Sequence, residues 1–391
     1  MRLLTLVTDA FGGRGGIAKF NRDLLASLCS HPATTEVVAL PRVMTEPVTR
    51  PMPENLVYRP EAAGGKAGYA RAVVQTLLTG GRFDGVVCGH LNLLPLAALA
   101  AAWKRAPLLL IIHGIDAWQP PEGGLMATLT RRAIAHVDAF VAVSALTKER
   151  FLAWSGLPEE RGFVVPNCID ASAFGPGPKR ADLLDRYGLK GKHVLLTLGR
   201  MSAAERYKGF DETMEAVAAL APDHPDLAYL ICGDGDDRLR LEQKATDLGL
   251  ADRVVFAGYI PEPEKADHYR LADAFVMPGR GEGFGIVYLE ALACGVPVVA
   301  SSRDASREAV RDGALGEVVD PDDPASVRAG ILRALATDHG GVPDGLAYFS
   351  FERFRERWHS VLGGVFGPPA PAAVRRYAAV SPTTDSLTTA S

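Results

Sequence analysis

Short runs of Val, Ile and Leu alternate with helix-length segments along most of the chain. In the first half the apolar runs are residues 3–8, 37–40, 85–88, 108–112 and 139–143. Segments such as 17–29, 125–135 and 145–154 have helical periodicity and lie between them. Apolar strands that are each followed by a helix are typical of βαβ units and of a parallel sheet buried on both faces. The pattern therefore predicts an α/β protein.

A Pro- and Gly-rich stretch, Ala171–Pro178, interrupts this alternation, and the pattern then starts again. The second set of predicted strands is 194–198, 228–232, 254–257, 274–277 and 298–300, with helices at 210–221, 239–248, 266–271 and 286–294. We therefore predict two doubly wound, Rossmann-like domains, with ligands bound between them at the carboxyl ends of the strands. The predicted divisions are a first domain 1–170, a linker 171–180, a second domain 181–366 and a flexible tail 367–391, which is rich in Pro, Ala, Ser and Thr.

The overall composition limits the class of protein. Net charge is -4 over 391 residues, so nothing at chain level favours nucleic-acid binding, although a local basic patch is compatible with contact to a membrane surface. The five cysteines are scattered without metal-ligand spacing, which is typical of a reduced, cytoplasmic protein. The apolar run 91–103 is too short to span a bilayer, so we expect a soluble protein.

The segment Pro278–Gly295 contains the densest set of functional signals. Four glycines follow a predicted strand and precede a predicted helix, an arrangement in which backbone N–H groups and the helix dipole favour an anion such as phosphate. Glu282 lies in the loop and Glu290 in the helix. Carboxylates beside a phosphate site are better suited to accepting hydrogen bonds from hydroxyl groups, which a nucleotide sugar offers on both its sugar and its ribose. A solvated loop at a helix N-terminus is the simpler alternative.

Two cations lie at the start of the second α/β half. Arg200 follows the strand 194–198, and Lys208 with Gly209 opens the next helix. At this edge of a sheet an arginine fork and a lysine point charge can together neutralise a diphosphate.

These segments together resemble the retaining glycosyltransferases of family 4, which have the GT-B fold. The resemblance rests on the pairing of Gly199-Arg200 and Lys208-Gly209 with the segment Glu282–Ala291. It extends to shorter matches over nearly the whole chain up to the tail: Gly15-Gly16, His113–Asp116, Pro166-Asn167 with Asp170, Ile231–Gly235 and Val255–Tyr259.

The resemblance implies roles for individual residues. It implies that Arg200 and Lys208 hold the donor diphosphate, that Glu282 contacts the transferred sugar, and that Glu290 binds the ribose. The other implied positions are His113 facing the sugar, Gly15 and Gly16 beside the donor phosphates, Tyr259 and Ile260 at the base, and the backbone of Phe284, Gly285 and Ile286 beside the sugar. His113 depends most on the resemblance, because a lone histidine after a strand is more often structural.

Several other ligands are disfavoured by the residues present. The loop Gly13–Ala18 matches a dinucleotide-binding glycine pattern, but the next predicted strand ends without an acidic residue for a ribose. The pairs Asp234/Asp236 and Asp320/Asp322 have a spacing used for metal-bound sugar donors, yet their contexts favour helix-cap and turn roles. We therefore expect no metal and no cofactor, with the nucleotide sugar as co-substrate.

The implied activity is transfer of a sugar from a UDP- or GDP-linked donor to an acceptor hydroxyl, with retention of anomeric configuration. The acceptor is expected to be a sugar, a lipid-linked molecule or another small molecule, in polysaccharide or glycolipid synthesis. We expect a cytoplasmic enzyme with room for peripheral contact at the inner face of a membrane. The alternatives that stay open are a hydrolase or phosphorylase on the same fold, and a non-catalytic nucleotide-sugar-binding scaffold or sensor.

Overall fold

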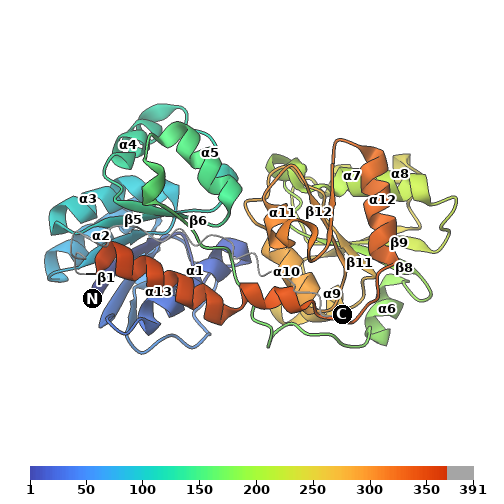
Figure 1. Ribbon diagram of the computed structural model, residues 1–391, viewed down its shortest axis with the longest axis horizontal. Helices are drawn as coiled ribbons and strands as arrows, with labels where there is room; N and C mark the ends of the chain where they lie inside the picture. Colours follow the sequence, from blue (N-terminus) through green and yellow to red (C-terminus); the bar gives the residue numbers. More distant parts are fainter. Residues whose placement is uncertain (368–391) are drawn as a thin grey trace, which may run out of the picture.

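The computed structural model describes residues 1–367 and consists of two α/β domains joined by extended segments (Figure 1). The first domain has one parallel sheet in the order β3-β2-β1-β4-β5-β6-β7. Its strands are β1 (Arg2–Val7), β2 (Glu36–Pro41), β3 (Leu56–Tyr58), β4 (Gly85–Cys88), β5 (Leu108–Ile112), β6 (Ala139–Ala142) and β7 (Gly162–Val164).

The second domain has a parallel sheet in the order β10-β9-β8-β11-β12-β13. Its strands are β8 (His193–Leu198), β9 (Leu227–Cys232), β10 (Val254–Gly258), β11 (Ala274–Val276), β12 (Val298–Ser301) and β13 (Glu317–Val319). The predicted fold class, two doubly wound parallel-sheet domains, is confirmed.

Helices cover both faces of each sheet. The α-helices associated with the first domain are α1 (Gly15–Ser30), α2 (Gly65–Thr79), α3 (Leu94–Lys104), α4 (Gly124–Ile134), α5 (Ala145–Ser155) and α13 (Phe351–Phe366). Those of the second domain are α6 (Ala181–Tyr187), α7 (Phe210–Leu220), α8 (Arg238–Asp247), α9 (Lys265–Tyr269), α10 (Ile286–Ala293), α11 (Ser306–Ala309) and α12 (Pro324–Leu335). The 3-10 helices are η1 (Pro60–Ala62), η2 (Leu91–Leu93), η3 (Ile115–Ala117), η4 (Glu159–Arg161), η5 (Ala203–Lys208), η6 (Glu262–Glu264), η7 (Arg311–Gly313) and η8 (Asp344–Phe349).

The apolar runs form strands because both faces of each sheet are buried. In β1, Leu4 and Leu6 pack under α2 and α3, whereas Leu3 and Val7 belong to the core on the opposite face, with α1 and α13. This second core continues into the other domain under α9 and α10, while α7, α8 and α12 cover the far face of that sheet. Side chains of a strand alternate between faces, so a run without polar residues satisfies both cores.

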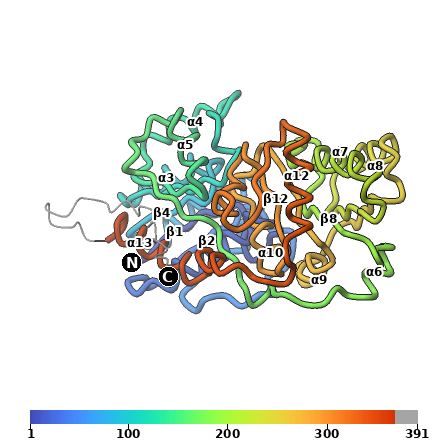
Figure 2. The backbone as a smooth tube through the Cα atoms, turned by 45° about the vertical axis from the view of Figure 1, so that its right-hand side comes forward, coloured from blue at the N-terminus to red at the C-terminus, as the bar shows by residue number. Residues whose placement is uncertain are grey.

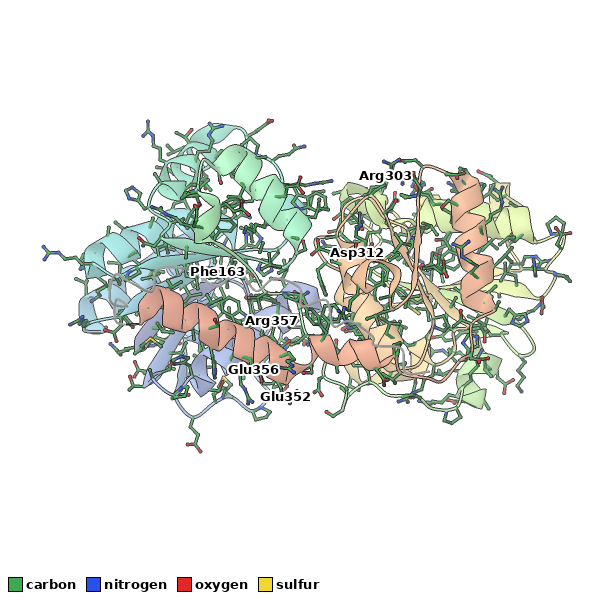
Figure 3. All side chains as sticks on the ribbon, in the orientation of Figure 1. Phe163, Arg303, Asp312, Glu352, Glu356 and Arg357 are labelled. Carbon is green, nitrogen blue, oxygen red and sulfur yellow. The ribbon has the colours of Figure 1, made fainter. Side chains whose placement is uncertain are left out.

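The last helix of the described chain returns to the first domain. Helix α13 belongs to the segment 181–366, which was predicted as the second domain, but it packs on α1 of the first domain. Nε2 of His359 lies within hydrogen-bond distance of the Ser30 hydroxyl, at 3.1 Å. Figure 3, which labels Glu356 and Arg357 on α13, shows the helix running along the first domain. The chain therefore crosses between the domains twice, before α6 and before α13. The predicted tail lies outside the described residues except for Gly367.

Several elements had no prediction, namely the short strands β3, β7 and β13 and the α-helices α2, α3, α6, α11, α12 and α13. Three-residue strands give too little apolar pattern to be recognised, and α3 is almost uniformly apolar because it packs between α2 and α4. Within residues 1–367, no helix has both the length and the apolar character needed to cross a membrane.

Candidate active site between the two sheets

The carboxyl ends of the two sheets face each other. Gly114, which follows β5, lies so close to Gly283, which follows β11, that a Cβ on Gly114 would be 2.8 Å from the Gly283 Cα. A Cβ on Gly16, after β1, would lie 3.9 Å from Cγ2 of Ile286 in the first turn of α10. The predicted ligand position is therefore the place where loops of both domains meet.

A carboxylate of the second domain also holds the first domain at this edge. Glu308 accepts hydrogen bonds from the backbone N–H groups of Ala145 and Leu146 at 2.7 and 2.9 Å. These groups belong to the first turn of α5, where backbone donors have no partner within the helix. In Figure 1, α5 and α11 lie in the upper part of the view and the segments that cross between the domains lie in the lower part, so the interaction joins the domains away from these crossings.

Neighbouring groups pack closely against the glycine-rich loop before α10 and restrict its conformation. A Cβ on Gly281 would lie 2.4 Å from the ring of Tyr207, and Gly285 has a φ of 86° at the N-cap of α10. Phe284 is buried and its ring centroid lies 5.6 Å from that of Phe349. The loop therefore leads directly into a helix whose first N–H groups lie at the domain junction.

Two helices begin at this junction from opposite sides. Helix α1 starts at Gly15, whose φ is 84°, and α10 starts at Ile286. Both N-termini have unpaired backbone donors and a positive dipole end. The space beside Gly16 and Ile286 is consequently favourable for an anion.

The two predicted diphosphate ligands share one carboxylate that was not predicted. Arg200 follows β8 and is 69% exposed, and its guanidinium pairs with Glu205. Nζ of Lys208 lies 3.3 Å from Oε2 of Glu205. Burial alone would raise the pKa of Glu205, but Arg200 and Lys208 outweigh it and lower that pKa. Glu205 is therefore an anion bound between the two cations.

Lys208 also connects this cluster to Glu282. Its Nζ lies 3.5 Å from Oε1 of Glu282, so the structure brings together Arg200, Lys208 and Glu282. Burial acts to lower the pKa of Lys208, but the carboxylates of Glu282 and Glu205 outweigh this and raise it. Lys208 is thus a partly buried permanent cation at the centre of the cluster.

Glu290 belongs to α10 and is 1% exposed. The hydroxyl of Tyr269 donates to its Oε2 at 2.7 Å, and Nζ of Lys265 lies 3.6 Å from its Oε1. Burial raises the pKa of Glu290, although Lys265 and Tyr269 act in the opposite direction. The predicted ribose ligand therefore has one oxygen firmly bonded and one held only by a longer ion pair.

Asp304, which follows β12, fixes the backbone at Glu282. Its Oδ2 accepts from the Glu282 N–H at 2.9 Å, and its Oδ1 accepts from the Ser306 hydroxyl at 2.6 Å. Burial raises the pKa of Asp304 to about 6, against the effect of these hydrogen bonds. The carbonyl of Glu282 in turn accepts from Ala305 N–H at 3.0 Å, so the residue is held from both sides.

His113 lies on the opposite wall, after β5. Its Nε2 is 2.8 Å from the carbonyl oxygen of Gly89, and its ring meets Phe20 edge to face at 4.9 Å. Burial lowers the pKa of His113 to about 4, so the ring is neutral at pH 7 and Nε2 carries the donated proton. The backbone of His113 touches the glycine loop, because a Cβ on Gly283 would lie 2.0 Å from its carbonyl oxygen.

The predicted base-contacting turn follows β10. Tyr259 is 53% exposed, and the guanidinium of Arg14 lies 5.0 Å from its ring centroid. The next residue, Ile260, is buried. Arg14 precedes α1, so this stacked pair spans the two domains on one side of the junction.

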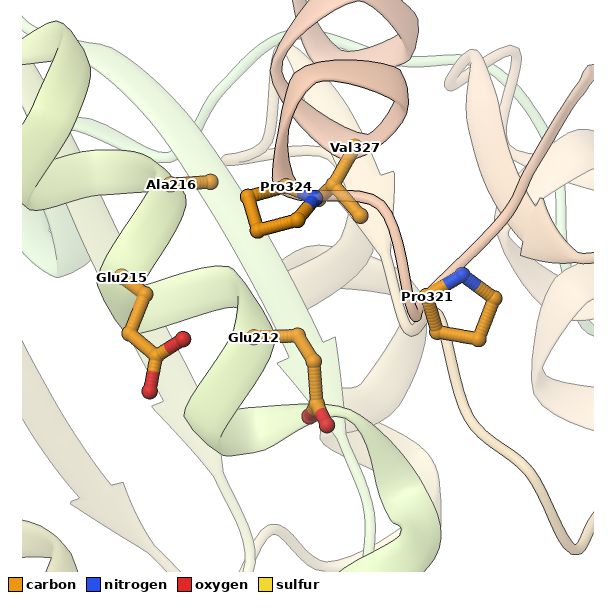
Figure 4. A pocket seen from close by; sticks show the side chains of 6 residues that line it. All are labelled: Glu212, Glu215, Ala216, Pro321, Pro324 and Val327. Atoms are coloured by element: carbon orange, nitrogen blue, oxygen red, sulfur yellow. The ribbon is translucent and has the colours of Figure 1, made fainter.

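The residues set aside in the sequence have structural partners elsewhere. Asp236 accepts from Ala203 N–H at 2.9 Å, and Asp322 lies 2.9 Å from Nε of Arg280. A small pocket between α7 and α12 is lined by Glu212 and Glu215 with apolar groups (Figure 4). The charged groups that line this pocket are these two carboxylates, which would repel an anionic ligand. They pair with Arg280 and Lys244. Among residues 1–367 no group of three or more His, Cys, Asp or Glu side chains is arranged to hold a metal ion.

Four contributing residues escaped prediction, namely Glu205, Asp304, Tyr269 and Lys265. Glu205 precedes Lys208 by three residues, a spacing that places side chains together in a helical turn and could have indicated the pair. Asp304 had no such signal. Its role depends on the proximity of the ends of β11 and β12, which are adjacent strands of the sheet.

Comparison with known proteins gives matches on both sides of this junction. The profile of "Glycosyltransferase Family 4" matches residues 14–173, and that of "Glycosyl transferases group 1" matches residues 182–340. The GDP-mannose-dependent alpha-(1-6)-phosphatidylinositol monomannoside mannosyltransferase of Mycolicibacterium smegmatis is 36% identical over 268 residues, which are 65% of this chain and 68% of that protein. The D-inositol 3-phosphate glycosyltransferase 1 of Catenulispora acidiphila is 35% identical over 66% of this chain and 65% of its own length.

Solved structures give the same fold. The Anabaena protein HepE in complex with UDP superposes with a TM-score of 0.71 at 20% identity, covering 93% of this chain and 100% of that one. Sucrose-phosphate synthase from Thermosynechococcus elongatus gives a TM-score of 0.66 at 19% identity, covering 93% and 96%. At these identities the likeness concerns the GT-B fold alone.

Proposed function

The chain belongs to the glycosyltransferases of family 4, group 1, and from this premise we propose that it transfers a hexosyl group from a nucleoside diphosphate sugar to an acceptor hydroxyl with retention of configuration. The observation that supports this most is the convergence of Arg200, Lys208 and Glu282 beside the N-termini of α1 and α10. Cations and helix N-termini suit a diphosphate, and a carboxylate at their edge suits sugar hydroxyls.

In the proposed reaction the bond between the anomeric carbon and the diphosphate oxygen breaks while the acceptor oxygen forms its bond on the same face of the sugar. The acceptor proton passes to the departing diphosphate. Arg200, Lys208 and the first turn of α10 would stabilise the negative charge that develops on the leaving oxygen. Contact between the two glycine loops would exclude water and limit hydrolysis of the donor.

GDP-mannose and a phosphoinositol-type acceptor are the first substrates to test. The relative at 36% identity is named as GDP-mannose-dependent, and the relative at 35% identity is named as a D-inositol 3-phosphate glycosyltransferase. The acceptor side contains a cation that suits a phosphate. Arg42 follows β2 and forms no ion pair among the described residues. Burial lowers the pKa of His90 to about 4, and the positive charge of Arg42 acts in the same direction. His90 follows β4, so both groups lie at the edge that bears His113.

We also propose that the enzyme associates peripherally with the cytoplasmic face of a membrane. All five cysteines are unpaired and buried, as expected of a reducing compartment. A lipid-linked acceptor, like the phosphatidylinositol derivative in the name of the Mycolicibacterium relative, would require access to a bilayer.

The decisive experiment incubates the protein with GDP-mannose or UDP-glucose, with and without inositol phosphate, and measures the released nucleoside diphosphate. Acceptor-dependent release and an α-linked product from an α-linked donor, determined by NMR, would support retaining transfer. Release that is unchanged by every acceptor would indicate a hydrolase, and binding without release would indicate a scaffold. Glu282→Gln is the matched variant, because it keeps the size of the side chain.

A further inference from the structure

We propose that the outward face of helices α2, α3 and α4 docks on an anionic lipid bilayer, an inference that rests on the proposed glycosyl transfer for its purpose. The three helices lie side by side on one face of the first sheet, and their inward residues form one apolar core with it. We call their outward face the α2–α4 surface. In Figures 1 and 2 it lies far from α7 and α8 of the second domain.

Large apolar side chains are concentrated on this surface. Of the seventeen that are exposed among residues 1–367, seven belong to these three helices. In α2 they are Val74 and Leu78, and in α3 they are Leu99 and Trp103, which is 51% exposed. Each pair has i, i+4 spacing, so both members of a pair point outward from the same helix face. Apolar side chains gathered in this way indicate an interaction site.

Helix α4 has the most exposed part of the surface. Leu125 is 72% exposed, and Met126 and Leu129 are also exposed. Arg131 and Arg132 follow within one turn and are exposed as well. An exposed apolar stripe beside cations is typical of helices that lie in the interface of a membrane.

The charged side chains of these three helices are all cationic, although the chain has a net charge of -4. The three helices contain Lys66, Arg71, Lys104, Arg131 and Arg132 and no Asp or Glu. Lys104 donates to the Gly81 carbonyl and lies over the ring of Phe83, but within residues 1–367 none of the other four cations has an ion pair or side-chain hydrogen bond. They are therefore free to attract anionic head groups.

The corresponding outer helices of the second domain are different. Lys244 on α8 pairs with Glu215 on α7 at 2.6 Å, and Arg240 pairs with Asp211 at 2.7 Å. Arg238, the remaining cation of α8, pairs with Glu242 at 2.7 Å. The cluster of unpaired cations on the α2–α4 surface therefore has no counterpart on α7 and α8.

This chemistry favours a bilayer over other partners. A second copy of the chain would bring two cationic faces together, and the repulsion would oppose a dimer. A nucleic acid would neutralise the cations but leave Leu125 and Trp103 facing water. An anionic bilayer accepts both kinds of group at once, because the apolar side chains enter the head-group region while the cations remain at the phosphates.

The α2–α4 surface lies beside the acceptor side of the proposed site. Helices α2, α3 and α4 follow the carboxyl ends of β3, β4 and β5, so they begin at the edge of the sheet that bears His113. Leu125 and Met126 are in the first turn of α4. A bilayer that contacts these residues would lie beside the acceptor side of the site, where a lipid-linked acceptor could present its head group.

The test is cosedimentation of the full chain with phosphatidylglycerol–phosphatidylcholine vesicles and with phosphatidylcholine vesicles. We expect binding to the anionic vesicles that weakens with added salt. The double variant Arg131→Gln/Arg132→Gln should bind on the order of tenfold more weakly, and Leu125→Ser/Met126→Ser should also lose binding. The controls Arg328→Gln and Leu239→Ser, on the second domain, should bind as the wild type does.

Tryptophan emission gives an independent measurement. Trp103 is the most exposed of the four tryptophans, so its emission should shift to the blue on anionic vesicles and Trp103→Phe should abolish the shift. Equal binding to neutral vesicles, no binding at all, or equal loss in the control variants would each overturn the proposal. Dimerisation with no vesicle binding would identify a second copy as the partner instead.

Donor turnover with a water-soluble acceptor separates this inference from the proposed function. The surface variants should keep that turnover unchanged and lose only transfer to an acceptor embedded in vesicles. If the wild type binds anionic vesicles but turns over no donor, the proposed function fails and the docking surface stands. If turnover occurs without vesicle binding, the docking surface fails alone.

Discussion

The carboxylate of Asp304 accepts a 2.9 Å hydrogen bond from the backbone N–H of Glu282. Asp304 comes from the end of β12 and Glu282 from the loop after β11, so one fully buried acid fixes the loop that carries the predicted sugar ligand. Asp304 thus restricts the position of Glu282, and it does so without contacting the substrate itself.

The first prediction concerns stability as pH changes. Burial raises the pKa of Asp304 from 3.8 to about 6, so the folded state holds this proton more tightly than the unfolded chain does. The associated stability is fully present below pH 4 and is lost as pH rises through about 6, and the difference corresponds to roughly 3 kcal/mol. In Asp304→Asn this dependence should be absent. Urea unfolding of both proteins from pH 4 to pH 8 would test it, and parallel pH profiles would contradict it.

The second prediction concerns the two cations. Charge develops on the leaving oxygen in the transition state, so Arg200→Ala and Lys208→Ala should each lower kcat by roughly 10²–10³. Both cations contact Glu205, so their effects should not be independent, and the double variant should lose less than the combined losses of the single variants. Steady-state kinetics on folded variants would test this. Normal rates in either single variant would place the diphosphate elsewhere.

The third prediction separates the two glutamates. Glu282→Gln should mainly lower kcat, because Glu282 is expected to contact the reacting sugar. Glu290→Gln should mainly weaken donor binding, because ribose contacts change little during the reaction. Glutamine is preferred to alanine for Glu290, since alanine would leave Lys265 and Tyr269 buried without their partner. Calorimetric donor affinities and single-turnover rates would distinguish the two effects, and reversed signatures would refute the assignment.

The strand pattern predicted both sheets because each long strand is buried on two faces and has no polar break. The pattern missed three-residue strands such as β3, whose register depends on its neighbour β2. Arg200 and Lys208 were predictable because both follow strand ends at one edge of a sheet. Asp304 was not, since nothing near it in sequence indicates that its carboxylate meets the backbone of Glu282, twenty-two residues earlier.

The fourth prediction is that transfer does not require a divalent ion. Arg200, Lys208 and the N-termini of α1 and α10 supply positive charge where a donor diphosphate would lie. Turnover should therefore persist in excess EDTA. Loss of turnover in EDTA that manganese or magnesium restores would show that a metal ion holds the diphosphate.

The fifth prediction follows from the position of Glu205. Its carboxylate pairs with Arg200 and lies 3.3 Å from Nζ of Lys208, and these are the two cations assigned to the diphosphate. A diphosphate must displace this carboxylate or share the cations with it, and in either case the two anions repel each other. Glu205→Gln removes the negative charge and keeps the size of the side chain, so GDP or UDP should bind more tightly to the variant.

Removal of one competing charge near a protein surface should strengthen binding by about tenfold, and the gain should shrink as salt is added. Titration calorimetry of GDP and UDP with both proteins would measure it. The matched control is Glu215→Gln, because that carboxylate pairs with Lys244 on the outer face of α7. Weaker nucleotide binding in Glu205→Gln would show instead that Glu205 holds Arg200 and Lys208 in the geometry that the diphosphate needs.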